Sequence, residues 1–516
     1  MNLRFCRRRT ARRALQGLLV LFLFRTADPV SLAGQAAAVD SASPFDRQAA
    51  SSEALGLLKE LIRFRTVNPP GNEAELLRHV AGVLRKDGID SEIVEPEPGR
   101  GVLRAVLKGD GSKPAPLLLL AHVDVVGVEE GKWSMDPFEA VEKEGFLYGR
   151  GVIDDKGMAA AAVETMLLLK RSGEGRARDL ILILEGDEEA GGKLGIEWVL
   201  KNRPDWLRGA AFALNEGGRV MAAGEGGGGP SGPAGPRGVR WVGVQNVEKI
   251  PFSVDIIARG PSGHASMPRD DNAILRLAAA LAKLAEHHPL PRLIPETREF
   301  FHDLASVSPK DEAEHLAAVV DIIREQIRTG GSFLAPKYGS RLVEGPHTKA
   351  VSKDPMFNAM LRDTFSPTLL ASGIRTNVIP AEARATINCR ILPDTPPATF
   401  IEELKQAAGD EGLEWKLHEE PEAAPAASPM DSDLVRAIAT AARSLWKGVP
   451  VLPLLSTGAT DSQALRRAGI PSYGLLPFPL GTDDLARMHG NDERVPLAAF
   501  ADGVELLYRS VRQALR

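Results

Sequence analysis

The sequence predicts an α/β protein, in which a mostly parallel β-sheet flanked by helices carries a smaller inserted α+β domain. Two continuous apolar runs, within residues 116–126 and 179–189, are typical of strands that are buried on both faces. Helical stretches alternate with these runs. From residue 247 the strands alternate apolar and polar side chains instead, and after a linker at 421–429 the helix–strand alternation returns. The second domain is therefore expected to interrupt the first.

Size and composition limit the class of protein. A chain of 516 residues is expected to form two or three domains. Apolar residues make up 44% and charged residues 25%, as in ordinary globular enzymes, which excludes a wholly disordered, collagenous or disulfide-scaffold protein. Only one apolar run, near the N-terminus, resembles a targeting segment, so a multispan membrane protein is also excluded.

Residues 1–38 are predicted to be a signal peptide. The first 13 residues contain six arginines, an apolar stretch follows at 14–24, and small residues come after it. This stretch is shorter than the ~20 residues that span a bilayer, so no membrane span is expected after cleavage. The mature protein is then exported, either periplasmic or secreted. An uncleaved N-terminal anchor is the alternative.

Cleavage of this segment also changes the net charge and the number of cysteines. It contains seven arginines and one aspartate, so its removal lowers the formal net charge from −5 to −11. An acidic chain without a basic patch is a poor partner for nucleic acid, and none is expected. Cys6 leaves with the segment and Cys389 stays behind alone, so the mature chain cannot form an internal disulfide.

The main domain is expected in two parts, residues 39–246 and 424–516. The small and polar residues 39–53 predict a flexible lead-in, and the Gly-rich residues 221–238 predict a loop or a disordered insertion. The elements expected in the first part are a helix at 54–66, a strand within 116–126, a helix at 154–173, a strand within 179–189 and a weaker strand within 210–218.

The inserted domain is expected at residues 247–423. Its strands and helices predict a small α+β domain with one open sheet face. A charged, helical and irregular stretch covers about 285–365. The elements expected around it are a strand at 251–260, a helix at 272–287, two strands joined by a turn within 374–392, a helix at 398–410 and a strand at 413–420.

Acidic and histidine side chains gather where the predicted strands of the main domain end. In open α/β sheets, functional groups lie beyond the carboxyl ends of the strands. Like charges this close together repel one another, so a cation is needed to hold them. The residues concerned are His122, Asp124, Asp154, Asp155, Asp187, Glu188, Glu189, Asn215, Glu216 and His489.

These residue types predict a metal site. Imidazole and carboxylate ligands without a thiolate suit zinc, and also manganese or cobalt. Two divalent ions would balance three ligand carboxylates and one bridging hydroxide, which gives the neutral sum that a partly buried site requires. In the pair His122 and Asp124, the carboxylate can accept the proton of the imidazole nitrogen that faces away from the metal.

Together the motifs resemble the co-catalytic dizinc aminoacylase and carboxypeptidase family, which includes aminoacylase, carboxypeptidase G, carboxypeptidase S, acetylornithine deacetylase and succinyl-diaminopimelate desuccinylase. The resemblance covers residues 55–516 and is strongest to the branch of carboxypeptidase S-like and N-acyl-amino-acid hydrolases. It implies a zinc-exopeptidase-like main domain and a ferredoxin-like lid that also dimerises. The motifs, in the family's order, are AHVDVV, GRGVIDDKG, EGDEEAGG, ALNEGG, GPSGHASMP, TNVIPAEARATINCRI, TGATDSQ and MHGNDE.

The resemblance also implies a role for each site residue. One zinc ion is bound by His122 and Glu216, the other by Glu189 and His489, and Asp154 bridges them, with a cis peptide to Asp155. Asp124 orients His122, and Glu188 is the general base. His264 stabilises the oxyanion, often across a dimer interface. The substrate is held by Asn377, Arg390 and the turn from Gly458 to Asp461.

The implied function is metal-dependent hydrolysis of an amide bond next to an amino acid with a free carboxylate, using a water activated by two zinc ions. The substrate is a small peptide or an N-acyl amino acid, and the sequence leaves these two open. A homodimer through the inserted domain is expected. A catalytically silent binding protein on the same fold is the alternative, although the base and every ligand are present.

Overall fold

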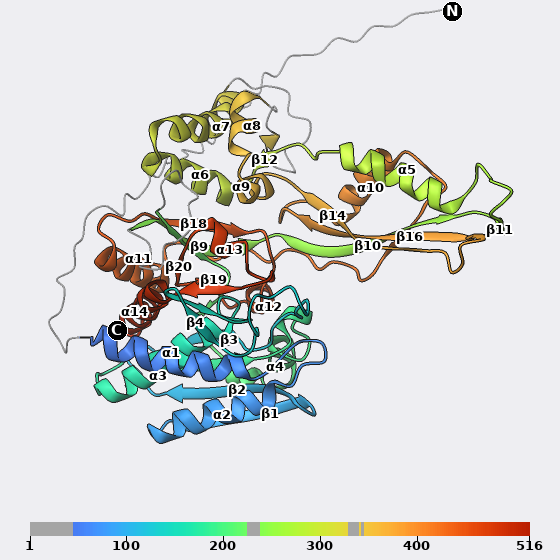
Figure 1. Ribbon diagram of the computed structural model, residues 1–516. Helices are drawn as coiled ribbons and strands as arrows, with labels where there is room; N and C mark the ends of the chain where they lie inside the picture. Colours follow the sequence, from blue (N-terminus) through green and yellow to red (C-terminus); the bar gives the residue numbers. More distant parts are fainter. Residues whose placement is uncertain (1–44, 224–237, 329–339, 342–344) are drawn as a thin grey trace, which may run out of the picture. The chain divides into compact units, whose positions relative to one another are not determined.

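The structure is a computed structural model that describes residues 45–223, 238–328, 340–341 and 345–516 (Figure 1). The predicted signal peptide and most of the predicted Gly-rich loop lie outside these residues. No helix in these ranges is long and apolar enough to cross a membrane.

The largest sheet has ten strands and confirms the predicted fold class. Its middle is parallel, in the order β6-β3-β7-β19, and its outer strands are mainly antiparallel. His122 pairs with Glu185 at the shared carboxyl end of β3 and β6. The strands are β1 Ser91–Glu97, β2 Arg100–Leu107, β3 Leu117–His122, β6 Leu180–Glu185, β7 Phe212–Asn215, β8 Arg219–Ala222, β9 Val239–Glu248, β18 Val451–Ser456, β19 Ser472–Gly474 and β20 Pro479–Leu480.

Helices cover both faces of this sheet because its central strands are apolar on both sides. In β3, Leu117 and Leu119 belong to one apolar cluster, and Leu118 and Leu120 to another. The first cluster is completed by α1 Arg47–Arg63, α2 Glu73–Lys86, α3 Lys156–Ser172, α11 Asp433–Leu445 and α14 Leu497–Ala514. The second is completed by α4 Ile196–Asn202, η2 Pro204–Trp206 and α12 Ser462–Arg467.

The end of one helix agrees with its predicted position, and the start of another differs from it. The predicted helix at 154–173 ends as expected, because Gly173 adopts the left-handed conformation that closes α3. The first helix begins at Arg47 rather than at residue 54, so a flexible lead-in was wrong for residues 47–53. Asp46 caps this helix by accepting a hydrogen bond from the backbone of Ala49, and Ala50 is buried.

A second, antiparallel sheet of four strands has its own apolar core. Its strand order is β14-β16-β10-β17, and α5 and α10 pack against it (Figure 1). The elements are β10 Ile250–Arg259, β14 Thr364–Ser372, β16 Glu382–Ile391, β17 Glu414–Leu417, α5 Ala273–Glu286 and α10 Pro397–Ala408.

The two strands predicted within 374–392 pair differently from the expectation. β16 pairs with β10 and with β14, which lies upstream of the predicted pair. β15 Val378–Ile379 pairs instead with β11 Gly263–His264, and Pro380 separates it from β16. The antiparallel neighbour of β16 is therefore β14, and not another strand within residues 374–392 as expected.

The described residues of the stretch near 285–365 include helices that pack on the main sheet. Phe300 and Phe357 share an apolar cluster with Trp241 of β9 and with Leu452 and Leu454 of β18. The boundaries of the inserted domain stay a prediction. The sequence analysis did not predict that these helices pack on the main sheet. The helices are α6 Pro295–Val307, α7 Lys310–Arg328, α8 Pro346–Val351 and α9 Pro355–Met360.

Short elements complete the described chain. They are β4 Val141–Lys143, β5 Phe146–Tyr148 and β21 Arg494–Pro496 in one small sheet, β12 Arg292–Leu293 paired with β13 Ser340–Arg341, the turn η1 Glu188–Ala190, and α13 Thr482–Leu485.

Candidate metal centre and substrate pocket

Three neighbouring parallel strands deliver acidic and imidazole groups to one edge of the main sheet. β3 ends at His122, with Asp124 two residues later. β6 leads into η1, which contains Glu188 and Glu189, and β7 leads to Glu216. Because β6, β3 and β7 are adjacent and parallel, their carboxyl ends lie together.

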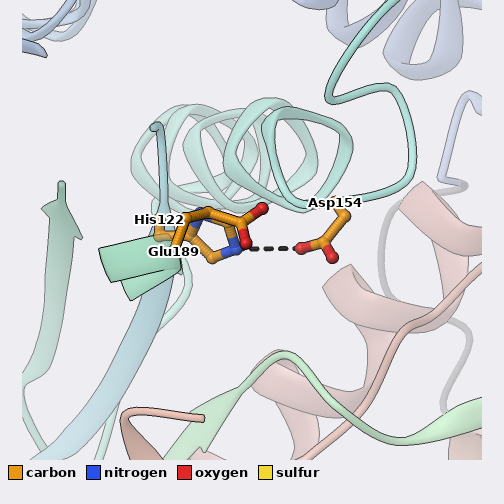
Figure 2. A group of neighbouring side chains, drawn as sticks. All are labelled: His122, Asp154 and Glu189. Carbon is orange, nitrogen blue, oxygen red and sulfur yellow. Dashed lines mark hydrogen bonds and ion pairs between the residues drawn. The ribbon is translucent and has the colours of Figure 1, made fainter. Parts of the chain in front are cut away.

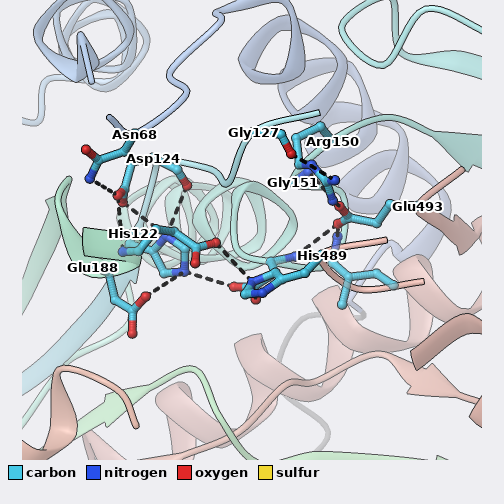
Figure 3. A network of polar contacts seen from close by, with 12 residues as sticks. Asn68, His122, Asp124, Gly127, Arg150, Gly151, Glu188, His489 and Glu493 are labelled. Carbon is cyan, nitrogen blue, oxygen red and sulfur yellow. Dashed lines mark hydrogen bonds and ion pairs between the residues drawn. The ribbon is translucent and has the colours of Figure 1, made fainter. Parts of the chain in front are cut away.

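Asp154 reaches the same edge from the loop between β5 and α3. The peptide between Asp154 and Asp155 is cis. The carboxylate of Glu493 fixes this loop by accepting hydrogen bonds from the backbone of Gly151 at 3.1 Å and of Ile153 at 2.8 Å (Figure 3). Arg150 donates a further hydrogen bond to Glu493 at 2.6 Å, and both side chains are buried.

Asp154 lies between two histidines. Its Oδ1 is 2.9 Å from Nε2 of His122, and its Oδ2 is 2.9 Å from Nε2 of His489. His489 also lies 3.2 Å from Oε1 of Glu189. One ligand atom each from His122, Asp154 and Glu189 lie within 4.8 Å of one another, and the three side chains converge in Figure 2.

This group fits a zinc-class ion by its donor chemistry. It presents imidazole nitrogens and carboxylate oxygens, the ligands that zinc takes besides thiolate. Oε1 of Glu189 is buried, and its polar contact among the described residues is that with His489 at 3.2 Å. Both carboxylate oxygens of Asp155 are buried and accept no hydrogen bond from a described residue. Glu216 lines the adjoining pocket but lies outside the group of three.

Asp124 connects the ligand side chains behind the metal group. Its Oδ1 is 3.3 Å from Nδ1 of His122, on the side of the ring that faces away from Asp154. Its Oδ2 accepts hydrogen bonds from Asn68 at 2.8 Å and from the backbone of Glu189 at 3.2 Å (Figure 3). The contact has the geometry that an orienting role for Asp124 requires.

Asp187 shapes the turn that presents Glu188 and Glu189. Its backbone has a φ of 75°, in the left-handed region that residues other than glycine seldom adopt. The side chain accepts hydrogen bonds from Arg100 at 2.9 Å, from the backbone of Leu194 at 2.8 Å and from Asn68 at 3.2 Å. These contacts hold the turn in place.

The cluster shifts the pKa values of its own members. Burial lowers the pKa of His122, but the hydrogen bonds to Asp124 and Asp154 outweigh it and raise this pKa well above its ordinary value. Hydrogen bonds to Asp154 and Glu189 raise the pKa of His489 to about 10. Burial raises the pKa of Glu188 well above its usual range. A cation in this acidic cluster would favour the ionised carboxylates.

A cavity of about 670 Å³ opens beside the metal group. The predicted site residues that line it are Asp154, Glu188, Glu189, Glu216, Arg390, Gly458, Asp461 and His489. Arg390 is oriented by a hydrogen bond from its Nε to Asn388 at 3.0 Å. The apolar part of the wall includes Met356 of α9 and Leu454 of β18.

The structure places two predicted substrate residues, His264 and Asn377, away from this cavity. His264 lies in β11 and pairs with Val378, and the backbone of Ala265 donates a hydrogen bond to the carbonyl of Asn377 at 3.1 Å. Both side chains are exposed, and neither lines the cavity. Asn377 comes directly before β15, whereas Arg390 is the second-last residue of β16.

Sequence reasoning missed several supporting residues. Glu493 and Arg150 stand inside the motifs MHGNDE and GRGVIDDKG. The motifs mark both positions, but the sequence does not show that Arg150 donates a hydrogen bond to Glu493. Asn68 lies in a Pro-rich turn after the first helix, and nothing in its surroundings indicates a contact with Asp124. Arg219 lines the cavity directly after the ALNEGG motif.

Comparison with known proteins gives a family match over most of the chain. A model of peptidase family M20/M25/M40 matches residues 118–513. N-fatty-acyl-amino acid synthase/hydrolase PM20D1 of Xenopus tropicalis is 28% identical, over 80% of this chain and 74% of its own. Aminoacylase-1 of Homo sapiens is 28% identical, over 88% of this chain and 93% of its own.

Solved structures share the fold. An M20 family metallo-carboxypeptidase from Sulfolobus solfataricus has a TM-score of 0.59 at 20% identity, covering 90% of this chain and 99% of its own. A di-peptidase from Saccharomyces cerevisiae has a TM-score of 0.62 at 16% identity, covering 91% of this chain and 97% of its own. The family model that matches residues 118–513 confirms the resemblance seen in the motifs.

Proposed function

The chain belongs to peptidase family M20/M25/M40, and from this premise we propose that it is a metal-dependent amidohydrolase. Its substrate is a small peptide or an N-acyl amino acid, cleaved at the amide next to an amino acid with a free carboxylate. One observation carries the proposal: His122, Asp154, Glu189 and His489 converge at the strand ends while Glu188 lines the adjoining cavity.

We assign two zinc-class ions to this centre. His122 and Glu216 would hold one, Glu189 and His489 the other, and Asp154 both, since its two oxygens each lie 2.9 Å from a histidine nitrogen. When bound, such ions polarise the amide carbonyl and lower the pKa of water towards neutrality. Cobalt or manganese would suit the same donors.

Glu188 acts as the general base. Its carboxylate lies 4.0 Å from Nε2 of His122, is 14% exposed and faces the cavity, so it can reach a water at the metal group. It takes the proton of the attacking water and later passes it to the leaving amine. Asp124 keeps the imidazole of His122 in the tautomer that leaves Nε2 free to bind metal.

Arg390 binds the free carboxylate of the substrate. Its Nε is engaged by Asn388, while its two terminal nitrogens form no hydrogen bond with the described residues. This leaves the planar fork available for a bidentate contact with a carboxylate. Gly458 and Asp461 complete the pocket on the side of α12.

The protein forms a homodimer through its second sheet, so that His264 and Asn377 act in the partner's pocket. In each chain they lie away from their own cavity. Large apolar side chains are exposed nearby, including Leu370 at 71% and Ile374 at 92%. A second chain covering these residues would bury them and would supply the oxyanion donor that each pocket otherwise lacks.

The same protein is exported through the N-terminal signal peptide, which is cleaved near residue 38. The basic start, the short apolar stretch and the small residues after it support this route. N-terminal sequencing of the exported protein checks it: a mature start between residues 34 and 40 is expected, and an intact Met1 would contradict cleavage.

A hydrolysis screen tests the activity. The zinc-loaded protein is assayed with dipeptides and with N-acyl amino acids, before and after removal of the metal by a chelator. We expect cleavage of at least one class, loss of activity on chelation, and its return when zinc is added back. If the metal-loaded protein binds these compounds but cleaves none of them, the catalytically silent alternative is correct.

A further inference from the structure

Arg219 is a positively charged side chain in the substrate cavity. It lines the cavity together with Arg390 and Arg467. No residue that the structure describes forms a hydrogen bond or an ion pair with its guanidinium. The other two arginines are engaged: Arg467 forms an ion pair with Glu422 at 2.6 Å, and Arg390 donates to Asn388.

The backbone fixes where Arg219 points. Arg219 begins β8, and side chains alternate across this strand: Val220 lies in the cluster of the main helix layer, and Met221 in the cluster shared with α6–α9. Arg219 therefore lies on the same face as Met221. The preceding residue, Gly218, packs tightly against the neighbouring backbone, since a Cβ there would lie 2.2 Å from the carbonyl oxygen of Gly474.

No acidic group that the structure describes forms an ion pair with Arg219. Asp354 raises its pKa only from a distance, since the carboxylate of Asp354 already accepts hydrogen bonds from the backbone of Met356 at 2.8 Å and of Phe357 at 3.1 Å. Glu216, three residues away in the chain, forms no ion pair with Arg219. Burial lowers the pKa of Arg219, because removing a charge from water has a free-energy cost.

An anion in the cavity would remove this cost. Arginine stays charged in proteins and presents a planar fork that matches a carboxylate. Arg390 already supplies the fork for the carboxylate next to the scissile amide, so Arg219 can serve another group. Met356 and Leu454 line the same cavity, and they suit the methylene groups that would connect a second carboxylate to the rest of the substrate.

We propose that Arg219 is a specificity-determining residue that binds a second carboxylate of the substrate, so that the enzyme prefers amides that carry two carboxylates. This rests on the proposed function and narrows its substrate class. The second carboxylate belongs either to the side chain of the released amino acid or to the far end of the acyl group. Both sources offer the same chemistry to the guanidinium.

Two matched pairs of substrates separate these sources. N-Acetylglutamate and N-acetylglutamine differ only in a charge on the amino-acid side. N-Succinyl-leucine and N-succinamoyl-leucine, in which a primary amide replaces the far carboxylate of the acyl group, differ only in a charge on the acyl side. With the zinc-loaded wild type we expect kcat/KM to favour the charged member of one pair by at least about tenfold, the scale of a charge-assisted bidentate contact.

Variants of Arg219 test whether this residue causes the preference for the charged substrate. Arg219→Gln should abolish it while changing kcat/KM of the uncharged member by less than about threefold, and Arg219→Lys should keep part of it, since the charge stays but the fork is lost. Arg467→Gln is the matched control, an arginine of the same cavity that is already paired, and it should keep the preference. Thermal melting verifies that each variant is folded.

A binding measurement tests, independently of turnover, whether Arg219 binds a carboxylate. By calorimetry, wild type should bind glutarate at least about tenfold more tightly than glutaramate, and Arg219→Gln should bind the two equally. Equal binding by wild type, or a preference that survives in Arg219→Gln, overturns the role of Arg219. If the charged ligand is preferred but none of the four amides is cleaved, the proposed function fails and the carboxylate site of Arg219 stands.

Discussion

Glu188 is the residue on which the proposed chemistry depends most directly. Its carboxylate lies near the ligands without being one of the close group of three. Glu188→Gln is therefore expected to keep the metal and the fold and to lose at least ~100-fold in kcat, the usual scale for removal of a general base. Metal analysis and steady-state kinetics check this.

The matched control for this variant is Glu197→Gln, which removes another carboxylate from the wall of the same cavity. Its kcat should stay within a few-fold of wild type. Turnover near the wild-type level in Glu188→Gln itself would exclude this residue as the base.

Glu493 holds the loop that carries Asp154 without touching the metal group. In Glu493→Gln the neutral amide cannot balance the buried Arg150 or accept all of the backbone hydrogen bonds at Gly151 and Ile153. We expect metal affinity to fall by roughly 10–100-fold, as for other residues that orient ligands. Competition with a chromophoric chelator measures this, and unchanged affinity would show that the loop holds its position without Glu493.

Arg390 gives a test of substrate polarity. Arg390→Lys keeps the charge but loses the planar fork, so kcat/KM for substrates with a free carboxylate should fall by roughly 2–4 kcal/mol in transition-state binding. Metal content should not change. A substrate and its C-terminally amidated counterpart are compared on both proteins. Equal cleavage of the two by wild type would mean that Arg390 is structural.

At the scale of single elements, α3 contains a carboxyl group that resists ionisation. Glu164 is buried on this helix, and neither carboxylate oxygen has a hydrogen-bond partner among the residues described. Burial raises the pKa of Glu164 to about 8. The folded protein therefore holds this proton more tightly than the unfolded chain does, whose carboxyl ionises near its ordinary value of 4.5.

This pKa shift predicts a pH dependence of stability. Between the two pKa values the folded state binds more protons than the unfolded state, so the free energy of unfolding falls as the pH rises from about 4.5 to about 8. Glu164→Gln should remove this fall and stabilise the protein above pH 8 by at most roughly 5 kcal/mol, from about 1.4 kcal/mol per pKa unit. Denaturant titrations at pH 5 and pH 9 measure it, and an equal effect at both values would contradict the assignment.

The elements also show where sequence periodicity is a sufficient guide. The strands β3 and β6 and the helix α3 were predicted because their apolar pattern and the closing Gly173 act locally. The pairing of β16 with β14 was missed, because the choice of partner depends on which strand lies beside it in the folded sheet. The start of α1 was missed because polar and small residues hide the burial of Ala50.

At the scale of the whole molecule, the position of His264 predicts that activity needs two chains. His264→Ala and Glu188→Gln should each be nearly inactive. When they are mixed and allowed to exchange subunits, half of the dimers are mixed and each of these has one intact site, so about a quarter of wild-type activity should return. Light scattering checks the dimer.

An interface variant provides the complementary control. Leu370→Glu puts a charge among the exposed apolar residues of the second sheet and should yield monomers with low activity and normal metal content. A fully active monomer would refute a catalytic role for His264 across the interface.

The sequence by itself determined the α/β class, the ligand types and, through the order of its motifs, the family. These features are local: a buried strand needs a continuous apolar run, and a metal needs particular donor atoms at its end.

Only the tertiary structure decided which donors meet. His122 and His489 stand hundreds of residues apart in the chain, yet both contact Asp154, because β3, the Asp154 loop and the loop before β21 converge at one edge of the sheet. For the same reason the sequence could not distinguish Arg390, which lines the cavity, from Asn377, which precedes β15 and does not line it, nor show that Arg219 lies in that cavity without a polar partner among the described residues. Pairing and burial are properties of distances between segments, and the folded chain alone sets those distances.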